Sequence, residues 1–307
     1  MDQRGQGILA MLAVCLIWGI SGLYYKPLAP FGAGTVLAHR TFWSFVLFGG
    51  ILAVQGRLPA LWAILTGPQL GRVALAAVMI SINWLGFIWA VQNGHAVEAS
   101  LGYFIFPLAS VLAGVVFFNE RLSPAKWLAV ALAGVAVLVL IYGLSIGPWI
   151  SLLLAFSFCA YGVIKKGLDL GPMISVAAEV ALLTPLALLW LLAVAAGWIG
   201  AADAPGIFAS GGLAVMLVLS GAMTAVPLML FAFAARRVDL ATIGLLQYLN
   251  PTLQFLVAVL VMGEAVTRWH LIAFALIWTA LAIYTRASWQ ARRLVPDATL
   301  RIREQTK

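Results

Sequence analysis

The chain has 307 residues, of which 64% are hydrophobic and only 9% are charged, and its formal net charge at pH 7 is +8. Soluble proteins carry about 25% charged residues, and one globular core cannot bury this much apolar surface. The composition therefore excludes a soluble enzyme or binding module and indicates a membrane protein with several spans and no soluble domain.

Apolar runs of about 20 residues recur along the whole chain, and a helix of about 20 residues crosses a hydrocarbon core about 30 Å thick. The runs do not alternate between polar and apolar residues, which excludes a membrane-spanning β-barrel. The first run lacks a small-residue cleavage site, so we expect a retained span and not a signal peptide. The segment 55–72 is expected to lie in the membrane interface. The predicted membrane helices are 7–25, 36–54, 73–92, 99–118, 125–143, 149–165, 173–196, 213–233, 240–262 and 269–287.

The basic residues are unevenly distributed between the two sides that ten spans define. If the N-terminus is cytoplasmic, Lys26 and Arg268 remain outside, Arg40 lies within a span, and the other basic residues fall on the cytoplasmic side. This is the positive-inside asymmetry, so we expect both termini in the cytoplasm. The positive charge is thereby explained without a nucleic-acid partner, and the basic tail 288–307 is expected to lie on anionic membrane lipids.

The stretch Pro107–Tyr142 is repeated, loosely, from Pro251. In both copies a glutamate, Glu120 or Glu264, follows the proline by 13 residues. With five spans in each copy, the second copy inserts upside down relative to the first. We therefore predict an all-α membrane protein with ten transmembrane helices in two inverted-topology five-helix repeats, residues 1–147 and 148–287, followed by the tail 288–307.

Five strings of the sequence resemble the RarD family of the drug/metabolite transporter superfamily, whose repeated unit is the EamA domain. They are LAHRTFWS (37–44), NWLGFIWAVQNGHAVEASLGYFIFP (83–107), NERLSP (119–124), AYGVIKKGL (160–168) and LLQYLNPTLQFLVAVLVMGE (245–264). The resemblance covers residues 8–285. It implies a ten-span permease of the bacterial inner (plasma) membrane that exports small organic metabolites or drugs. One position departs from the family pattern: Phe106 stands before its repeat proline where Asn250 precedes the other, which implies a changed substrate preference if this position contacts the substrate.

Two charged residues, Arg40 and Glu179, occupy matching positions of the two repeats. A charge near the bilayer centre costs about 2.5–3.5 kcal/mol and persists mainly where it has a partner or a water-filled cavity. We expect Arg40 to engage Glu98 on the outer side. We expect Glu179 to engage Lys165 or Arg236 on the inner side, so that each pair closes the path in one state. The alternative is that both side chains snorkel to the nearer surface and have no role in gating.

Polar and aromatic residues gather shortly before the repeat prolines. A proline frees a backbone carbonyl in the preceding turn, and matching interruptions in two halves point to a binding site near the midplane. Hydrogen bonding between helices is the alternative role for these side chains. The residues expected to contact a small-molecule substrate are Trp18, Asn83, Trp84, Tyr103, Gln247, Tyr248 and Asn250.

The predicted loops carry further polar candidates. His95 lies three residues before Glu98 in a short outer connection. Because histidine titrates near neutral pH, this pair is a candidate for loading a coupling proton, with plain polar capping as the alternative. Glu120 and Glu264 stand at span ends, where we expect them to cap the N-termini of spans five and ten.

The sequence contains no HExxH or GxSxG motif and no pair of carboxylates at helical spacing, and Cys15 and Cys159 lie within spans. We therefore expect no catalytic residue, metal or cofactor. The pattern favours a secondary transporter that works by alternating access, with protons as the candidate coupling ion. A passive uniporter or facilitator channel and a non-transporting signalling subunit remain alternatives, because neither needs a coupling group. Small residues on spans four and five are compatible with a monomer or a homodimer.

Overall fold

The structure of the protein is a computed structural model. It describes residues 3–119, 122–143, 148–199, 211–235, 237–238, 243 and 246–305, and for residues 118, 288–289 and 291–305 it describes the backbone alone. Glu120, Arg236 and the predicted repeat boundary at 147 lie outside the described residues, so the predictions made for them stay predictions.

Every regular element of the described residues is a helix, as expected where lipid offers no hydrogen bonds to an unpaired backbone. The elements in chain order are α1 (Gln3–Gly19), α2 (Ser21–Tyr25), the 3₁₀-helix η1 (Lys26–Phe31), α3 (Gly32–Val54), α4 (Leu58–Leu65), α5 (Leu70–Gln92), α6 (Ala96–Phe118), α7 (Pro124–Gly143), α8 (Trp149–Lys166), α9 (Pro172–Ala195), α10 (Gly211–Leu219), α11 (Ala222–Ala235), α13 (Leu249–Leu256), the π-helix η2 (Val257–Val261) and α14 (Arg268–Gln305).

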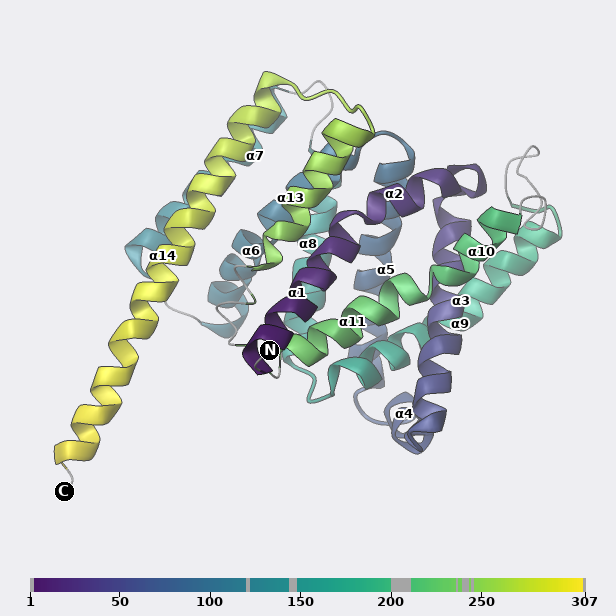
Figure 1. The fold of residues 1–307 in the computed structure, drawn as a ribbon, viewed down its shortest axis with the longest axis horizontal. Helices are drawn as coiled ribbons and strands as arrows, with labels where there is room; N and C mark the ends of the chain where they lie inside the picture. The colour runs from purple at the N-terminus through teal and green to yellow at the C-terminus, as the bar shows by residue number, and fades with distance from the viewer. Residues whose placement is uncertain are drawn as a thin grey trace.

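Eight helical stretches of the described residues are long and apolar enough to cross a membrane. Two shorter ones complete the predicted set: α1, with 17 residues, and Leu249–Val261, in which α13 continues into η2. The prediction of an all-α fold with ten membrane helices is thus confirmed. The segment expected in the interface contains the short helix α4, which packs against α9. Helix α1 begins, and α14 ends, toward the same side of the molecule as α4 (Figure 1).

The helix contacts pair up as they would if a two-fold rotation exchanged the two halves. Corresponding helices pack on each other: α3 on α9, and α7 on α14 at one edge of the molecule (Figure 1). Two further contacts have a matching counterpart, because α1 packs on α11 as α8 packs on α5, and α1 packs on α13 as α8 packs on α6. This pattern is the packing that an inverted repeat produces. The repeat boundaries themselves stay predictions.

The two-fold exchange relates two sets of helices, and the helices of only one set are continuous. One set, α5, α6 and α8, is unbroken, although Pro107 lies inside α6. In the matching set the chain breaks at Ile20 between α1 and α2 and at Ser220–Gly221 between α10 and α11, and α13 gives way to the π-helical η2. Pro107 therefore removes one backbone hydrogen bond without ending the helix, and the binding site expected near it stays a prediction. A proline is tolerated within a membrane helix where neighbouring groups satisfy the freed backbone carbonyl.

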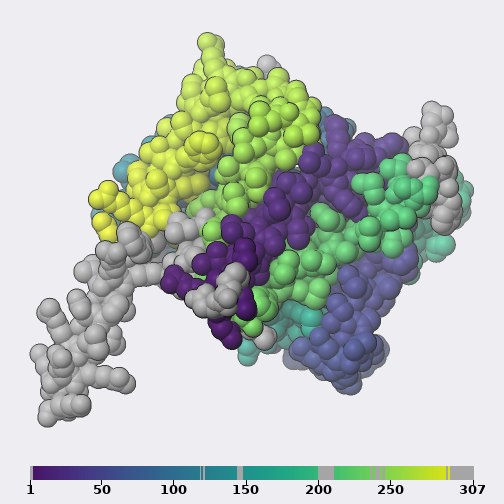
Figure 2. Space-filling model, in the orientation of Figure 1, coloured from purple at the N-terminus to yellow at the C-terminus, as the bar shows by residue number. Residues whose placement is uncertain are grey.

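Glycines allow close approach between the helices. A Cβ atom on Gly221 would lie 2.5 Å from the backbone carbon of Trp43, and one on Gly102 would lie 2.7 Å from the carbonyl oxygen of Ser151. Small residues at such contacts are typical of membrane helices, which associate by close packing because lipid tails are as apolar as their side chains. On the face drawn in Figure 2, α1 lies between α11 and the α13–η2 segment. The two halves are therefore interleaved and do not form separate bundles.

Candidate functional site

Arg40 lies within α3 and is only 6% exposed. Its Nε donates a hydrogen bond to Thr224 Oγ1 of α11 at 2.8 Å. The guanidinium carbon lies 4.2 Å from the ring centre of Trp84 in α5 and 5.6 Å from that of Tyr25 in α2. Aromatic faces attract a desolvated cation, so this charge is held by two rings and one hydroxyl that come from three other spans.

The predicted pair between Arg40 and Glu98 is not formed in this structure. Glu98 lies in the first turn of α6, and its Oε1 is 3.5 Å from Nδ1 of His95. Arg40 instead points among α2, α5 and α11, where two aromatic rings contact its guanidinium and the Thr224 hydroxyl accepts from its Nε. That the pair of Arg40 and Glu98 closes the path in another state stays a prediction.

Glu179 lies within α9 and is only 1% exposed. Its Oε1 is 2.6 Å from Nζ of Lys165 and accepts a hydrogen bond from Ser175 Oγ at 3.1 Å. Its Oε2 accepts a hydrogen bond from the Tyr161 hydroxyl at 3.1 Å. A buried carboxylate is tolerated when it is both paired and hydrogen-bonded. The predicted contact with Lys165 is present, while a gating role for this pair stays a prediction.

A row of aromatic rings connects these two charged positions through the interior. Tyr25, which faces Arg40, has its ring centre 6.2 Å from that of Phe87. Phe87 lies 5.8 Å from Tyr103, and Tyr103 lies 6.1 Å from Phe158. Phe158 then stacks on the ring of Tyr161, the residue that donates to Glu179, at 5.9 Å. Most of these neighbours meet edge to face, the arrangement that the ring quadrupoles favour.

Polar side chains from the first half adjoin this row. The Tyr103 hydroxyl donates to Asn83 Oδ1 at 2.9 Å, and Asn83 Nδ2 donates to the Leu154 carbonyl at 2.9 Å and to Ser157 Oγ at 3.2 Å. The structure thus brings together Asn83, Trp84 and Tyr103, three of the residues expected to contact substrate. Phe106, the residue that departs from the family pattern, packs its ring 4.7 Å from Phe158 and extends the same row.

Of the expected substrate contacts in the second half, only Asn250 lies close to Trp18, through Gln254. Asn250 Oδ1 accepts a hydrogen bond from Gln254 Nε2 at 3.2 Å, and the same nitrogen lies 3.5 Å from the Trp18 carbonyl. Tyr248 packs against the central apolar core, whereas Gln247 is exposed. The hydrogen bonds and ring contacts of the described residues do not join these residues to Asn83 or Tyr103. The prediction that all seven residues line one cavity is therefore not met in this conformation.

A small cavity lies between the first, third, fourth and ninth spans. Its volume is about 10 Å³, and Gly22, Phe87 and Gln254 are among the residues that line it. This is about the space that one water molecule requires. Gln254 Oε1 is buried and has no partner among the described residues. This cavity is thus too small for an organic solute in this conformation.

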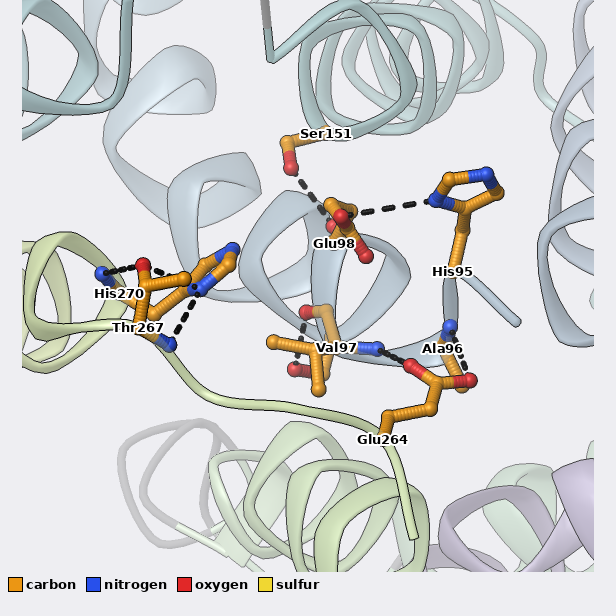
Figure 3. Close-up of polar contacts among 9 residues, drawn as sticks. His95, Ala96, Val97, Glu98, Ser151, Glu264, Thr267 and His270 are labelled. Carbon is orange, nitrogen blue, oxygen red and sulfur yellow. Dashed lines mark hydrogen bonds and ion pairs between the residues drawn. The ribbon is translucent and has the colours of Figure 1, made fainter. Parts of the chain in front are cut away.

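Glu264 joins the two halves at the end predicted to be periplasmic. Its two carboxylate oxygens accept hydrogen bonds from the backbone N–H groups of Ala96 and Val97, each at 2.9 Å, at the start of α6 (Figure 3). Gly263, with φ of 70°, turns the chain there. A carboxylate at a helix N-terminus satisfies free N–H groups and interacts favourably with the helix dipole. The expectation that Glu264 caps span ten was wrong, because the helix that it caps belongs to the other half.

Two histidines flank this contact. The His95 ring stacks on Trp89 with ring centres 5.6 Å apart and lies beside Glu98 (Figure 3). His270 is buried, its Nδ1 accepts from the Thr267 backbone N–H at 3.2 Å, and its Nε2 has no partner among the described residues. No role was expected for His270 from the sequence, where its only signal is its position six residues after the repeat glutamate Glu264. The residues of the described chain include no group of three His, Cys, Asp or Glu side chains that could hold a metal ion.

Comparisons with known proteins agree with this geometry. Residues 5–142 match the model of the EamA-like transporter family. Protein RarD of Streptomyces exfoliatus is 44% identical over 98% of this chain and 94% of its own length, and Protein RarD of Escherichia coli is 40% identical over 92% and 94%. The chain belongs to the RarD family of EamA-like transporters. An uncharacterized transporter of Vibrio cholerae is 36% identical to this RarD-family chain over 95% of it and 98% of the relative.

A solved crystal structure supports the fold of this RarD-family member. It superposes with a TM-score of 0.57 at 18% identity and covers 92% of this chain and 98% of its own chain. Together with the apolar helices, family membership shows that the protein is a multi-pass membrane protein of a transporter family.

Proposed function

We propose that this RarD-family protein is a secondary transporter of the bacterial inner membrane that exports small organic molecules by alternating access, with both termini in the cytoplasm. The observation that carries the proposal is the row of aromatic rings between Arg40 and Glu179, which draws on both halves. Charged side chains inside a membrane bundle are costly and mark solute paths. The row would offer an apolar or aromatic solute a continuous face to move along.

Alternating access needs one end to close while the other opens. The contact of Glu264 with Ala96 and Val97 ties the two halves together at the predicted outer end. The pair of Lys165 and Glu179 lies at the predicted inner end and involves only the second half. We therefore propose that Glu264 closes the outer end. At the predicted inner end Arg72 Nη1 donates to the Gly167 carbonyl of the other half at 3.3 Å, and we propose that the Lys165–Glu179 pair stabilises its own half there.

For the other predicted site residues we propose the roles expected from the sequence, which are substrate contact and proton loading. Asn83, Trp84 and Tyr103 adjoin the aromatic row and would contact the solute first. Residues Trp18, Gln247, Tyr248 and Asn250 would join them when the halves move. His95 and Glu98 would load the coupling proton, since their contact lies next to the outer closure. The proposal applies equally to a monomer and a homodimer in the lipid bilayer.

A two-step experiment tests the proposal. Purified protein is first screened by thermal shift against amino acids, aromatic metabolites, amines and amphenicols, and each stabilising compound is then followed in proteoliposomes. We expect an imposed proton gradient to drive at least one compound against its concentration gradient, and His95→Gln with Glu98→Gln to abolish this accumulation. Flux that only equilibrates the compound and does not respond to the gradient would instead identify a passive facilitator.

A further inference from the structure

We infer that Arg40 is a recognition site for the anionic head of the transported solute, and that this protein takes organic monocarboxylates with an apolar body. The inference rests on the proposed transport function and specifies its substrate class. Nothing else in the described interior balances the charge of Arg40, and the way the guanidinium is held leaves its outer edge available.

The contacts of Arg40 use only part of its hydrogen-bonding capacity. A guanidinium carries five N–H donors in a rigid fork, and only the Nε donor has a partner, Thr224 Oγ1. The Nη groups donate to no described residue, yet neither is among the buried nitrogen atoms that are fully enclosed without a partner. Trp84 and Tyr25 cover the guanidinium face but supply no acceptor to the Nη edge. Both Nη groups are therefore left without a protein acceptor among the described residues, and a bound anion could accept from both.

The carboxylates of the described side chains are engaged elsewhere or exposed. Among the described side chains, Glu98 faces His95, Glu179 faces Lys165, and Glu264 binds the start of α6. Asp169 is exposed in the connection between α8 and α9. A guanidinium that is 6% exposed without a counter-ion is costly in a membrane interior. The arrangement is thus incomplete without an anion.

The chemistry of this position favours an oxyanion, and its single unbalanced positive charge favours a carboxylate over a doubly charged phosphate. The planar fork of arginine matches two carboxylate oxygens in a bidentate pair, which a neutral amide or an amine cannot form. The interior charges of the described spans, Arg40 and Lys165 against Glu179, also favour an anion over a cation. The aromatic row begins at Tyr25 beside the guanidinium and would receive the apolar body of the same solute.

The test compares two ligands that share one body and differ in charge. Binding of phenylacetate and phenylacetamide to the purified protein is measured by thermal shift and calorimetry in a non-ionic detergent. We expect the wild-type protein to bind phenylacetate at least tenfold more tightly. Arg40→Gln should abolish the difference, and Arg40→Lys should reduce it several-fold because lysine lacks the fork. Arg268→Gln is the matched control, since this exposed arginine also lies over a tryptophan, Trp269, and should leave the ratio unchanged.

Several results would overturn the inference. These are equal binding of the two ligands, no binding of either, an undiminished ratio in Arg40→Lys, or a retained preference in a folded Arg40→Gln variant. The outcome is separable from that of the proposed function. Protein that transports neutral or cationic solutes but ignores phenylacetate defeats the anion site alone. Protein that binds phenylacetate through Arg40 but moves no solute defeats transport alone.

Discussion

Arg40 and Glu179 stand at matching positions of two repeated halves, and the protein stabilises them in opposite ways. The carboxylate of Glu179 is satisfied within its own half, by Lys165 and Tyr161 of α8 and by Ser175 one turn away. The guanidinium of Arg40 depends on α2, α5 and α11, and so on side chains from both halves. One charge is therefore locally complete, and the other depends on how the halves meet.

This difference indicates which charge responds to a conformational change. If the halves move relative to each other, α8 and α9 can carry the pair of Lys165 and Glu179 along unchanged. The same movement separates Arg40 from Thr224, because α3 and α11 belong to different halves. We expect the hydrogen bond between Arg40 and Thr224 to break when the transporter changes state. We expect the ion pair of Lys165 and Glu179 to stay intact and mainly to stabilise the second half.

The largest expected loss of stability comes from breaking the ion pair of Lys165 and Glu179. Lys165→Met leaves the carboxylate of Glu179 buried without a counter-charge, and breaking such a pair costs about 3–5 kcal/mol. Denaturant unfolding in mixed micelles should show this loss for the single variant. Replacement of both partners, Lys165→Met with Glu179→Met, should recover most of it, because hydrophobic residues of similar volume often replace a buried pair without a net loss. A double variant as unstable as the single one would show that Tyr161 and Ser175 also depend on the carboxylate.

A smaller loss of stability is expected when Arg40 loses its hydrogen bond to Thr224 of the other half. Thr224→Val keeps the shape of the side chain but removes the acceptor for Arg40 Nε, and a hydrogen bond to a charged group contributes about 1.5–3 kcal/mol. Thr224→Ser retains the oxygen and should lose less than half as much in the same unfolding measurement. If valine is tolerated as well as serine, the hydroxyl does not hold the arginine, and the rings of Trp84 and Tyr25 suffice.

The sequence predicted the helices and the Glu179 pair well because both depend on local information. Ten spans follow from apolar length, and Lys165 and Glu179 flank one short connection, which places them on adjacent helices. The partners of Arg40 could not be inferred in the same way. Thr224 lies 184 residues away, and an aromatic face leaves no charge pattern by which it can be recognised as the partner of a cation.

The role of Glu264 shows the same limit. Its position at a span end predicted a cap on the next helix in the chain, but the N–H groups that it binds lie 167 and 168 residues earlier. Only the packing of α13 and η2 against α6 brings the two segments together. The unbroken α6 at Pro107 has a similar explanation, since tertiary neighbours decide whether a proline interrupts a membrane helix.

The smallest expected effect is a change in the labelling rates of two native cysteines. Because one lies in each of the two helix sets, their rates compare the sets directly. Cys15 in α1 donates to the Leu246 carbonyl, 3.2 Å away, just before α13, whereas Cys159 lies in α8, and both are buried. Glu264→Gln removes the charge at the start of α6, which is worth about 1 kcal/mol. That change corresponds to about a fivefold shift of an opening equilibrium.

Opening at Glu264 should loosen the α13–η2 segment from α1 and leave α8 in place. In single-thiol variants made with Cys159→Ala or Cys15→Ala, a water-soluble maleimide should therefore label Cys15 about fivefold faster after Glu264→Gln and Cys159 less than twofold faster, because thiolates react where water reaches them. Asp169→Asn, the same chemical change at an exposed site, serves as the control and should alter neither rate. Equal acceleration at both thiols would mean that the two helix sets open together, and the contrast between a continuous and an interrupted set would then have no effect on opening.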